Sequence, residues 1–187
     1  GGFIAAMSAR EAVAVAWAAA VLGVRDNALM AAVADRTMQS GELTTFEAQD
    51  TTQLAQALAV LEVQNDALVG ALAHRIMEPE VLLKLQAPQV AVTAWAFSTF
   101  GAPGKALLQD IAWLTMQDGF LDTFNSQDLA VTAYALAKFG IRSEALVART
   151  ALQTMQINFP VPKVGADKVR EEGETAGEEG RDGIAGE

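Results

Sequence analysis

Residues 126–140 read SQDLAVTAYALAKFG, and this stretch decides the fold because its pattern recurs along the chain. Tyr134 stands between two alanines, and Phe139 and Gly140 follow it. Equivalent central positions occur every 39 residues, at Trp17, Gln56 and Trp95. Self-similarity at a fixed period of this length is the signature of proteins built from stacked helix pairs.

Other columns of the alignment keep the same register. Every central residue is flanked by alanine on both sides, and an Ala-Leu pair and then a methionine follow it. The large apolar residues five positions after the centre are Leu22, Leu61, Phe100 and Phe139, and the methionines are Met38, Met77, Met116 and Met155. This spacing predicts one helix around the centre, a turn marked in three copies by glycine, and a second helix ending near the methionine.

The chain is therefore predicted to be all-α, a right-handed α-solenoid of four 39-residue helix-turn-helix repeats. The repeats are expected at about 7–45, 46–84, 85–123 and 124–160, within one domain of residues 1–160. Residues 161–187 are rich in glycine and glutamate and are predicted to form an extended acidic tail.

The central residues are predicted to hold the repeats together. Flanking alanines allow close approach of helices, so the bulky side chain between them is expected to act as a buried knob between layers. These knobs are Trp17, Gln56, Trp95 and Tyr134. The methionine column is expected to be core as well. The second copy, which has Gln56 at the centre and Glu62 in place of glycine, is expected to be locally weaker.

Composition narrows the possible functions. The net charge is −10, and residues 1–160 alone carry fifteen acids and nine bases. Nine cations over this length are a poor footprint for binding a phosphate backbone. There is no cysteine and only one histidine, His74, so we expect no metal site, no cofactor and no catalytic residue. The longest apolar run, Ala12 to Val24, is too short to span a bilayer.

The runs PQVAVTAWAFSTFG (Pro88 to Gly101) and SQDLAVTAYALAKFG resemble octotricopeptide-type repeats. The resemblance covers about residues 7–160 and is best in the last two copies. It implies an α-solenoid in a chloroplast or mitochondrion. Many members of that family bind organellar RNA, and others are architectural subunits of large organellar assemblies.

Polar residues that recur on the first helices are the candidate ligand-facing positions. These are Glu11, Asp50, Gln89, Asp128, Thr93, Thr132 and Lys138. Three of the first four are acidic, which repels phosphate, although a carboxylate can accept a hydrogen bond from a base amino group. The alternative interpretation is that these residues cap and solubilise the first helices.

Two functions are consistent with these observations. The first is a non-enzymatic scaffold that binds protein subunits of an organellar complex, which the acidic body and the high apolar fraction favour. The second is a protein that binds single-stranded RNA in organellar gene expression, which rests mainly on the family resemblance.

Overall fold

The computed structural model describes residue 4 and residues 6–101 and 104–156, and these residues form helices with no strand among them. Four helices form one series, which we call the first helices: α2 (Ala9–Leu22), α4 (Ala48–Val60), α7 (Ala87–Phe100) and α9 (Ser126–Lys138). Each is followed by a second helix: α3 (Asn27–Met38), α5 (Asp66–Met77), α8 (Lys105–Leu114) and α10 (Glu144–Gln156). In both series each helix begins 39 residues after the one before it.

Short helices connect three of these pairs to the next. They are η1 (Gln39–Thr45), α6 (Pro79–Leu82) and η3 (Phe120–Thr123). The predicted acidic tail, residues 161–187, lies outside the described residues. None of the helices in the described part is long and apolar enough to cross a membrane.

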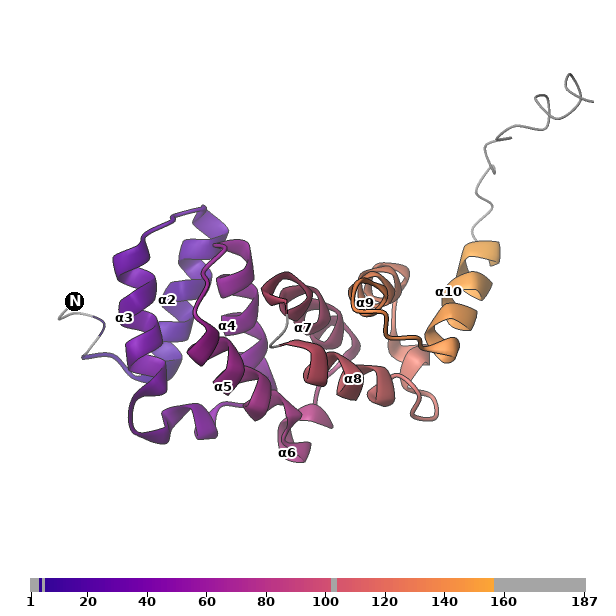
Figure 1. Cartoon of the computed structure of the whole chain (residues 1–187), viewed down its shortest axis with the longest axis horizontal. Coiled ribbons are helices and arrows are strands. Elements are labelled where there is room, and N and C mark those ends of the chain that lie inside the picture. Colours follow the sequence, from indigo (N-terminus) through magenta and orange to yellow (C-terminus); the bar gives the residue numbers. More distant parts are fainter. Residues whose placement is uncertain (1–3, 5, 102–103, 157–187) are drawn as a thin grey trace, which may run out of the picture. The chain divides into compact units, whose positions relative to one another are not determined.

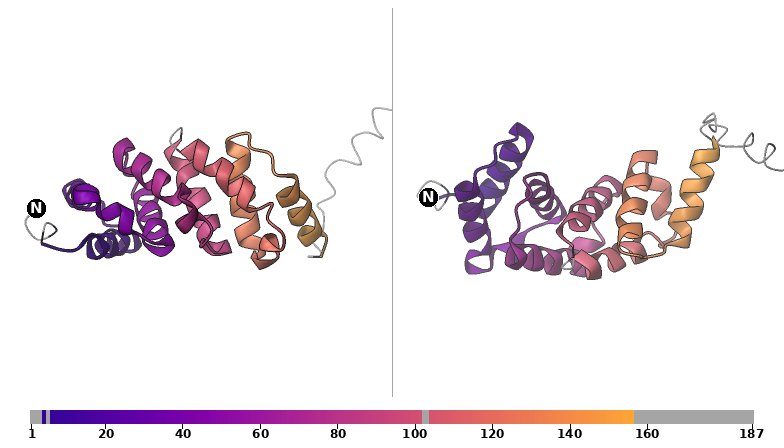
Figure 2. Two further views of the ribbon diagram at one scale, coloured as in Figure 1. Left: turned by 90° about the horizontal axis from the view of Figure 1, so that it is seen from below. Right: turned by 45° about the horizontal axis from the view of Figure 1, so that its top comes forward.

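The chain divides into two units, residues 1–153 and 154–187. Within the first unit the helix pairs are arranged in sequence order (Figures 1 and 2). The most extensive contacts join successive first helices, α2 to α4, α4 to α7 and α7 to α9. One continuous apolar core runs through these pairs and includes the fully buried Leu54, Leu72, Phe97 and Ile111.

Small residues occupy the interfaces between first helices. One side of α4 carries the buried small residues Ala48, Thr52, Ala55 and Ala59, which recur at helical spacing. The Thr52 hydroxyl lies 3.5 Å from the hydroxyl of Thr93 on α7, which fixes the register of this interface. Side chains this small allow the helix backbones to approach closely, so the interface is dense without bulky residues.

The helix ends follow from local sequence. Ser8 caps α2, and Glu11 in turn accepts hydrogen bonds from Ser8. Asp26, Asn65 and Asn125 cap α3, α5 and α9 with their side chains. Gly23 and Gly140 end their helices at a φ of 67°. Glu62 takes the place of glycine at a φ of 57°, and the Arg25 guanidinium holds its carboxylate through two hydrogen bonds of 3.1 Å.

Two buried or half-buried arginines tie second helices to the start of their own repeat. The Arg75 guanidinium on α5 donates to the carbonyl of Phe46 from Nε (2.9 Å) and from the second amino nitrogen (2.8 Å). It also pairs with Glu78 and Glu80. Arg36, the equivalent residue on α3, donates to the carbonyl of Met7 and pairs with Glu42. Each guanidinium therefore bridges a backbone carbonyl and carboxylates of the linker.

Replacing Arg75 by alanine should lower the free energy of unfolding by about 2–3 kcal/mol, because the Phe46 carbonyl loses two charged donors and the alkyl stem leaves a cavity. Urea unfolding followed by circular dichroism measures the change. Lys84→Ala removes one exposed positive charge and is the control. Equal stability of the two variants would contradict a bridging role for Arg75.

Stability should also fall in acid through Glu42. Its hydrogen bond from Arg36 holds the pKa of the Glu42 carboxyl below its ordinary value of 4.5. A lowered folded-state pKa contributes stability that is fully present above the unfolded-state pKa and is lost as the pH falls through the folded-state value. Urea midpoints measured from neutral pH down to about pH 3 should therefore decline less steeply in Glu42→Gln than in the wild type. A slope unchanged by this substitution would show that the pair does not contribute.

Candidate functional site on the outward face of the first helices

The central residues of the repeats lie on an exposed side of the first helices, which we call the outward face. Trp17 on α2 is 42% exposed and Tyr134 on α9 is 64% exposed, while Gln56 on α4 and Trp95 on α7 are half-buried. None of the four is enclosed in the core. The outward face thus presents two tryptophans, a tyrosine and a glutamine on four successive helices.

The prediction that these residues are buried knobs is wrong for Trp17 and Tyr134. The flanking alanines explain why. On α7, Ala94 before and Ala96 after Trp95 are both completely buried, because they face the neighbouring first helices on either side. The residue between them is turned away from both interfaces. The methionine column is likewise not core at Met38 and Met116, which are exposed, and the side chain of Met155 lies outside the described residues.

The candidate ligand-facing positions have four different environments, and the first is shared by three helix-capping residues. Glu11, Asp50 and Gln89 each accept a hydrogen bond from the backbone N–H at the start of their own helix, at 2.8, 3.0 and 2.9 Å. They therefore cap α2, α4 and α7, as the alternative interpretation supposed. The bonds from Ser8 lower the pKa of the Glu11 carboxyl.

Thr93 and Thr132 do not face a ligand, and that prediction is wrong for both. They are fully buried because they lie on the sides of α7 and α9 that pack against the preceding first helix. Thr132 donates to the carbonyl of Asp128 at 2.7 Å. Lys138 is exposed on the outward face, and its amine donates to the carbonyl of Ser98 on α7 at 2.7 Å.

Polar contacts cross the outward face between neighbouring first helices. Arg10 of α2 pairs with Asp50 of α4 at 3.3 Å. Gln89 of α7 donates to Gln49 of α4 at 3.0 Å. Asp128 of α9 is the next residue in this series, and it is buried with a carboxylate oxygen that has no hydrogen-bond partner among the described residues.

A pocket of about 260 Å³ opens beside Asp128 between α7 and α9. Its other walls are Ala91, Val92 and Trp95 from α7 and Gln127 and Val131 from α9. The pocket therefore combines one carboxylate, one amide and one indole with apolar side chains. It is large enough for a single side chain and too small for a typical cofactor.

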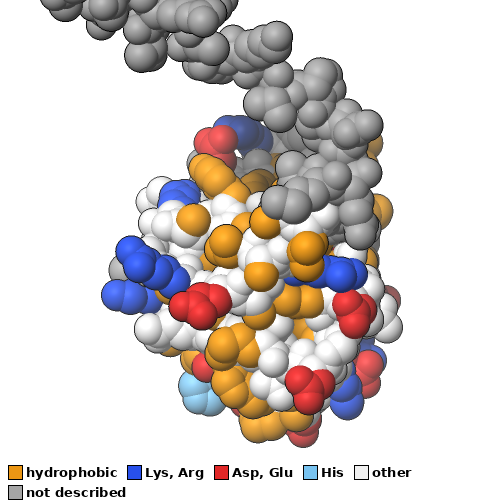
Figure 3. Space-filling model, turned by 90° about the vertical axis from the view of Figure 1, so that its right-hand side faces the viewer, with side chains coloured by type: hydrophobic (Ala, Val, Ile, Leu, Met, Phe, Trp, Pro, Cys, Tyr) orange, Lys and Arg blue, Asp and Glu red, His pale blue; other side chains and the backbone are white. Residues whose placement is uncertain are grey.

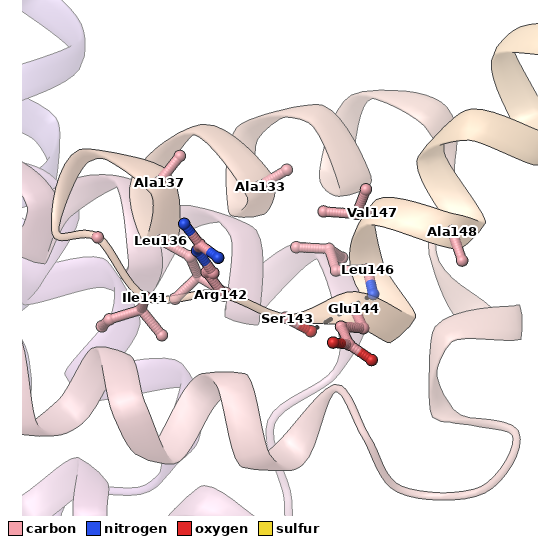
Figure 4. Close-up of a pocket in the computed structure, with 11 residues that line it drawn as sticks. Ala133, Leu136, Ala137, Ile141, Arg142, Ser143, Glu144, Leu146, Val147 and Ala148 are labelled. Atoms are coloured by element: carbon pink, nitrogen blue, oxygen red, sulfur yellow. Dashed lines mark hydrogen bonds between the residues drawn. The ribbon is translucent and has the colours of Figure 1, made fainter.

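A second, more apolar groove of about 640 Å³ lies between α9 and α10. Ala133 and Ala137 of α9 stand on one side of it and Val147 of α10 on the other (Figure 4). Val147 is 65% exposed, whereas Leu108, at the same place in the preceding repeat, is fully buried. Hydrophobic side chains also reach the surface at several places in the view from the α10 end (Figure 3).

Among the described residues, no group of histidine and acidic side chains could hold a metal ion. His74 lies exposed on α5, with Nδ1 3.7 Å from the Glu78 carboxylate. Sequence reasoning missed the exposure of the aromatic column, although the paired alanines around each centre were the signal for it.

Tyr134→Ala should change the free energy of unfolding by less than about 0.5 kcal/mol, because the ring is mostly in solvent. Leu136→Ala, on the same helix but fully buried, should cost about 2–4 kcal/mol. Urea unfolding of the two variants decides between a surface role and a core role for the aromatic column. Comparable losses in both would restore the knob interpretation.

Residues 3–165 match the family described as RNA-editing substrate-binding complex 6 protein. No curated protein matches the chain.

Proposed function

This chain belongs to the family of RNA-editing substrate-binding complex 6 proteins, and we propose that it is a non-enzymatic, architectural subunit of such a complex. In this proposal the helix pairs form a right-handed solenoid of four 39-residue repeats, similar to octotricopeptide-type repeats. Its role is to bind other protein subunits and hold them in place. We place it in the mitochondrion rather than the chloroplast, since the RNA-editing complexes of this family are mitochondrial in kinetoplastids.

The exposed aromatic column carries the proposal. Exposed tryptophan and tyrosine are enriched in protein interfaces, because they bury a large area at small entropic cost. Here Trp17 and Tyr134 are exposed on one face without being needed for the core. The apolar groove between α9 and α10 adds a second surface of the kind that partner proteins cover.

Affinity purification of the full chain from its own organism should recover RNA-editing complex proteins. The variant Trp17→Ser/Tyr134→Ser should recover much less of them, because the aromatic anchors of the interface are gone. Trp113→Ser is the matched control, since Trp113 is also exposed but lies on the second helix α8. Recovery of no editing-complex protein with the wild-type chain would contradict the proposed function.

Binding of single-stranded RNA is the second candidate function, and the same column favours it. Bases stack on exposed aromatic rings, and helical-repeat proteins can present one base-binding position per repeat. Against it, the cations of this face, Arg10 and Lys138, are both engaged by protein groups. Filter binding with single-stranded RNA at low salt tests it: saturable binding that Trp17→Ser/Tyr134→Ser removes would support RNA recognition, and no binding would exclude it.

A further inference from the structure

The Asp128 carboxylate is the one acidic group on the outward face that the described residues leave unsatisfied. Asp128 is 8% exposed, and its Oδ2 has no hydrogen-bond partner among them. A buried carboxylate oxygen without a donor is costly, and such groups in native proteins are normally paired. Oδ2 itself is closed off from solvent, but Asp128 also lines the pocket between α7 and α9, so an outside donor reaches this carboxylate when the side chain turns about its terminal torsion.

The first reason for this unpaired state is local. At the same helical position, Glu11, Asp50 and Gln89 accept the N–H of the residue three before them. In α9 that capping contact is absent. The Asn125 side chain accepts the N–H of Asp128 at 2.8 Å, as the Ser8 side chain accepts that of Glu11, but among the described helices only α2, α4 and α7 show the reciprocal bond to the side chain. The carboxylate of Asp128 is therefore not used to cap its own helix.

The second reason lies on the neighbouring helix. Arg10 supplies a cation to Asp50 across the α2–α4 interface, and Gln49 and Gln89 bond across the α4–α7 interface. Pro88 occupies the corresponding place on α7. Proline has no side-chain donor, so the α7–α9 interface lacks the partner that the first interface provides. The Arg10–Asp50 pair thus shows which group the Asp128 site is missing.

We propose that the pocket between α7 and α9 binds an arginine side chain of a partner protein. The guanidinium pairs with the Asp128 carboxylate, as Arg10 pairs with Asp50, and its planar face lies on the Trp95 indole. Either carboxylate oxygen can meet the donor, because the terminal torsion of aspartate is soft. This inference rests on the proposed function and specifies the partner surface: a basic segment with an exposed arginine.

The composition of the pocket favours arginine over a nucleobase. A carboxylate attracts a cation, an indole ring stabilises a cation on its face, and arginine combines both contacts with a planar donor array. No lysine or arginine lines the pocket to hold the phosphate that accompanies a base. The chain as a whole carries a net charge of −10, which attracts a basic partner and repels RNA.

Fluorescence titration of the full chain with a short peptide of alternating glycine and arginine tests the proposal. The background variant Trp17→Phe/Trp113→Phe leaves Trp95 as the only tryptophan, so its emission reports the site. We expect saturable binding. Asp128→Asn should weaken it about tenfold or more, because a charge-assisted hydrogen bond is lost. A neutral peptide with citrulline in place of arginine has nearly the same shape. It should bind the background protein about as weakly as the arginine peptide binds Asp128→Asn.

Two pairs of variants separate the site from general electrostatics and from misfolding. Asp118→Asn removes the same charge from an exposed loop and should leave the affinity unchanged. In Pro88→Arg, the new arginine of the chain itself should pair with Asp128 and occupy the pocket between α7 and α9. Peptide binding should then be lost, and the melting temperature should rise. Pro88→Gln is its matched control and should retain peptide binding. Circular dichroism confirms the fold of each variant.

Equal weakening by Asp128→Asn and Asp118→Asn would overturn the proposal, as would the absence of any Trp95 response. A single-stranded RNA that quenches Trp95 and depends on Asp128 would also overturn it, by assigning the pocket to a base. These failures differ from a failure of the proposed function. Editing-complex proteins that still co-purify with Asp128→Asn as strongly as with the wild type would leave the architectural role intact and remove only the arginine site.

Discussion

Close packing of small side chains between successive first helices is the constraint on which the rest of the structure depends. Because alanine, threonine and serine occupy these interfaces, the helices need no bulky residue to hold them in register. The large side chains of the core then come from between first and second helices, as with Phe97, Leu72 and Ile111. The same arrangement releases the central aromatic residues to the surface, where they are available for binding.

The interfaces between first helices combine small buried side chains with polar contacts at their edges. Buried alanines recur along these helices, among them Ala16, Ala55, Ala94 and Ala135. The polar contacts at the edge do differ: an ion pair joins Arg10 and Asp50, an amide hydrogen bond joins Gln49 and Gln89, and Asp128 Oδ2 has no hydrogen-bond partner among the described residues. The polar contacts at successive interfaces therefore differ although small buried side chains recur between the helices.

The sequence was informative about the elements and less so about their orientation. The period of 39 residues placed the helices because each copy carries its own turn residues and apolar spacing, and helix type follows from such local signals. Which side of a helix faces its neighbour depends on tertiary packing. The rule that bulky apolar residues are buried therefore misplaced Trp17 and Tyr134, and the rule that recurring hydroxyls are exposed misplaced Thr93 and Thr132. The unpaired state of Asp128 depends on what its carboxylate meets in the folded chain, and no single-residue pattern indicates it.

The turn at Glu62 has a consequence for how the repeats fold. A left-handed backbone conformation costs free energy at any residue other than glycine, and here the Arg25 guanidinium from the preceding repeat holds the glutamate in place. The second repeat therefore closes its turn most favourably when the first is already formed. In an array whose stability is a sum of nearest-neighbour terms, this exposed ion pair adds a small term to the coupling between the first two helix pairs.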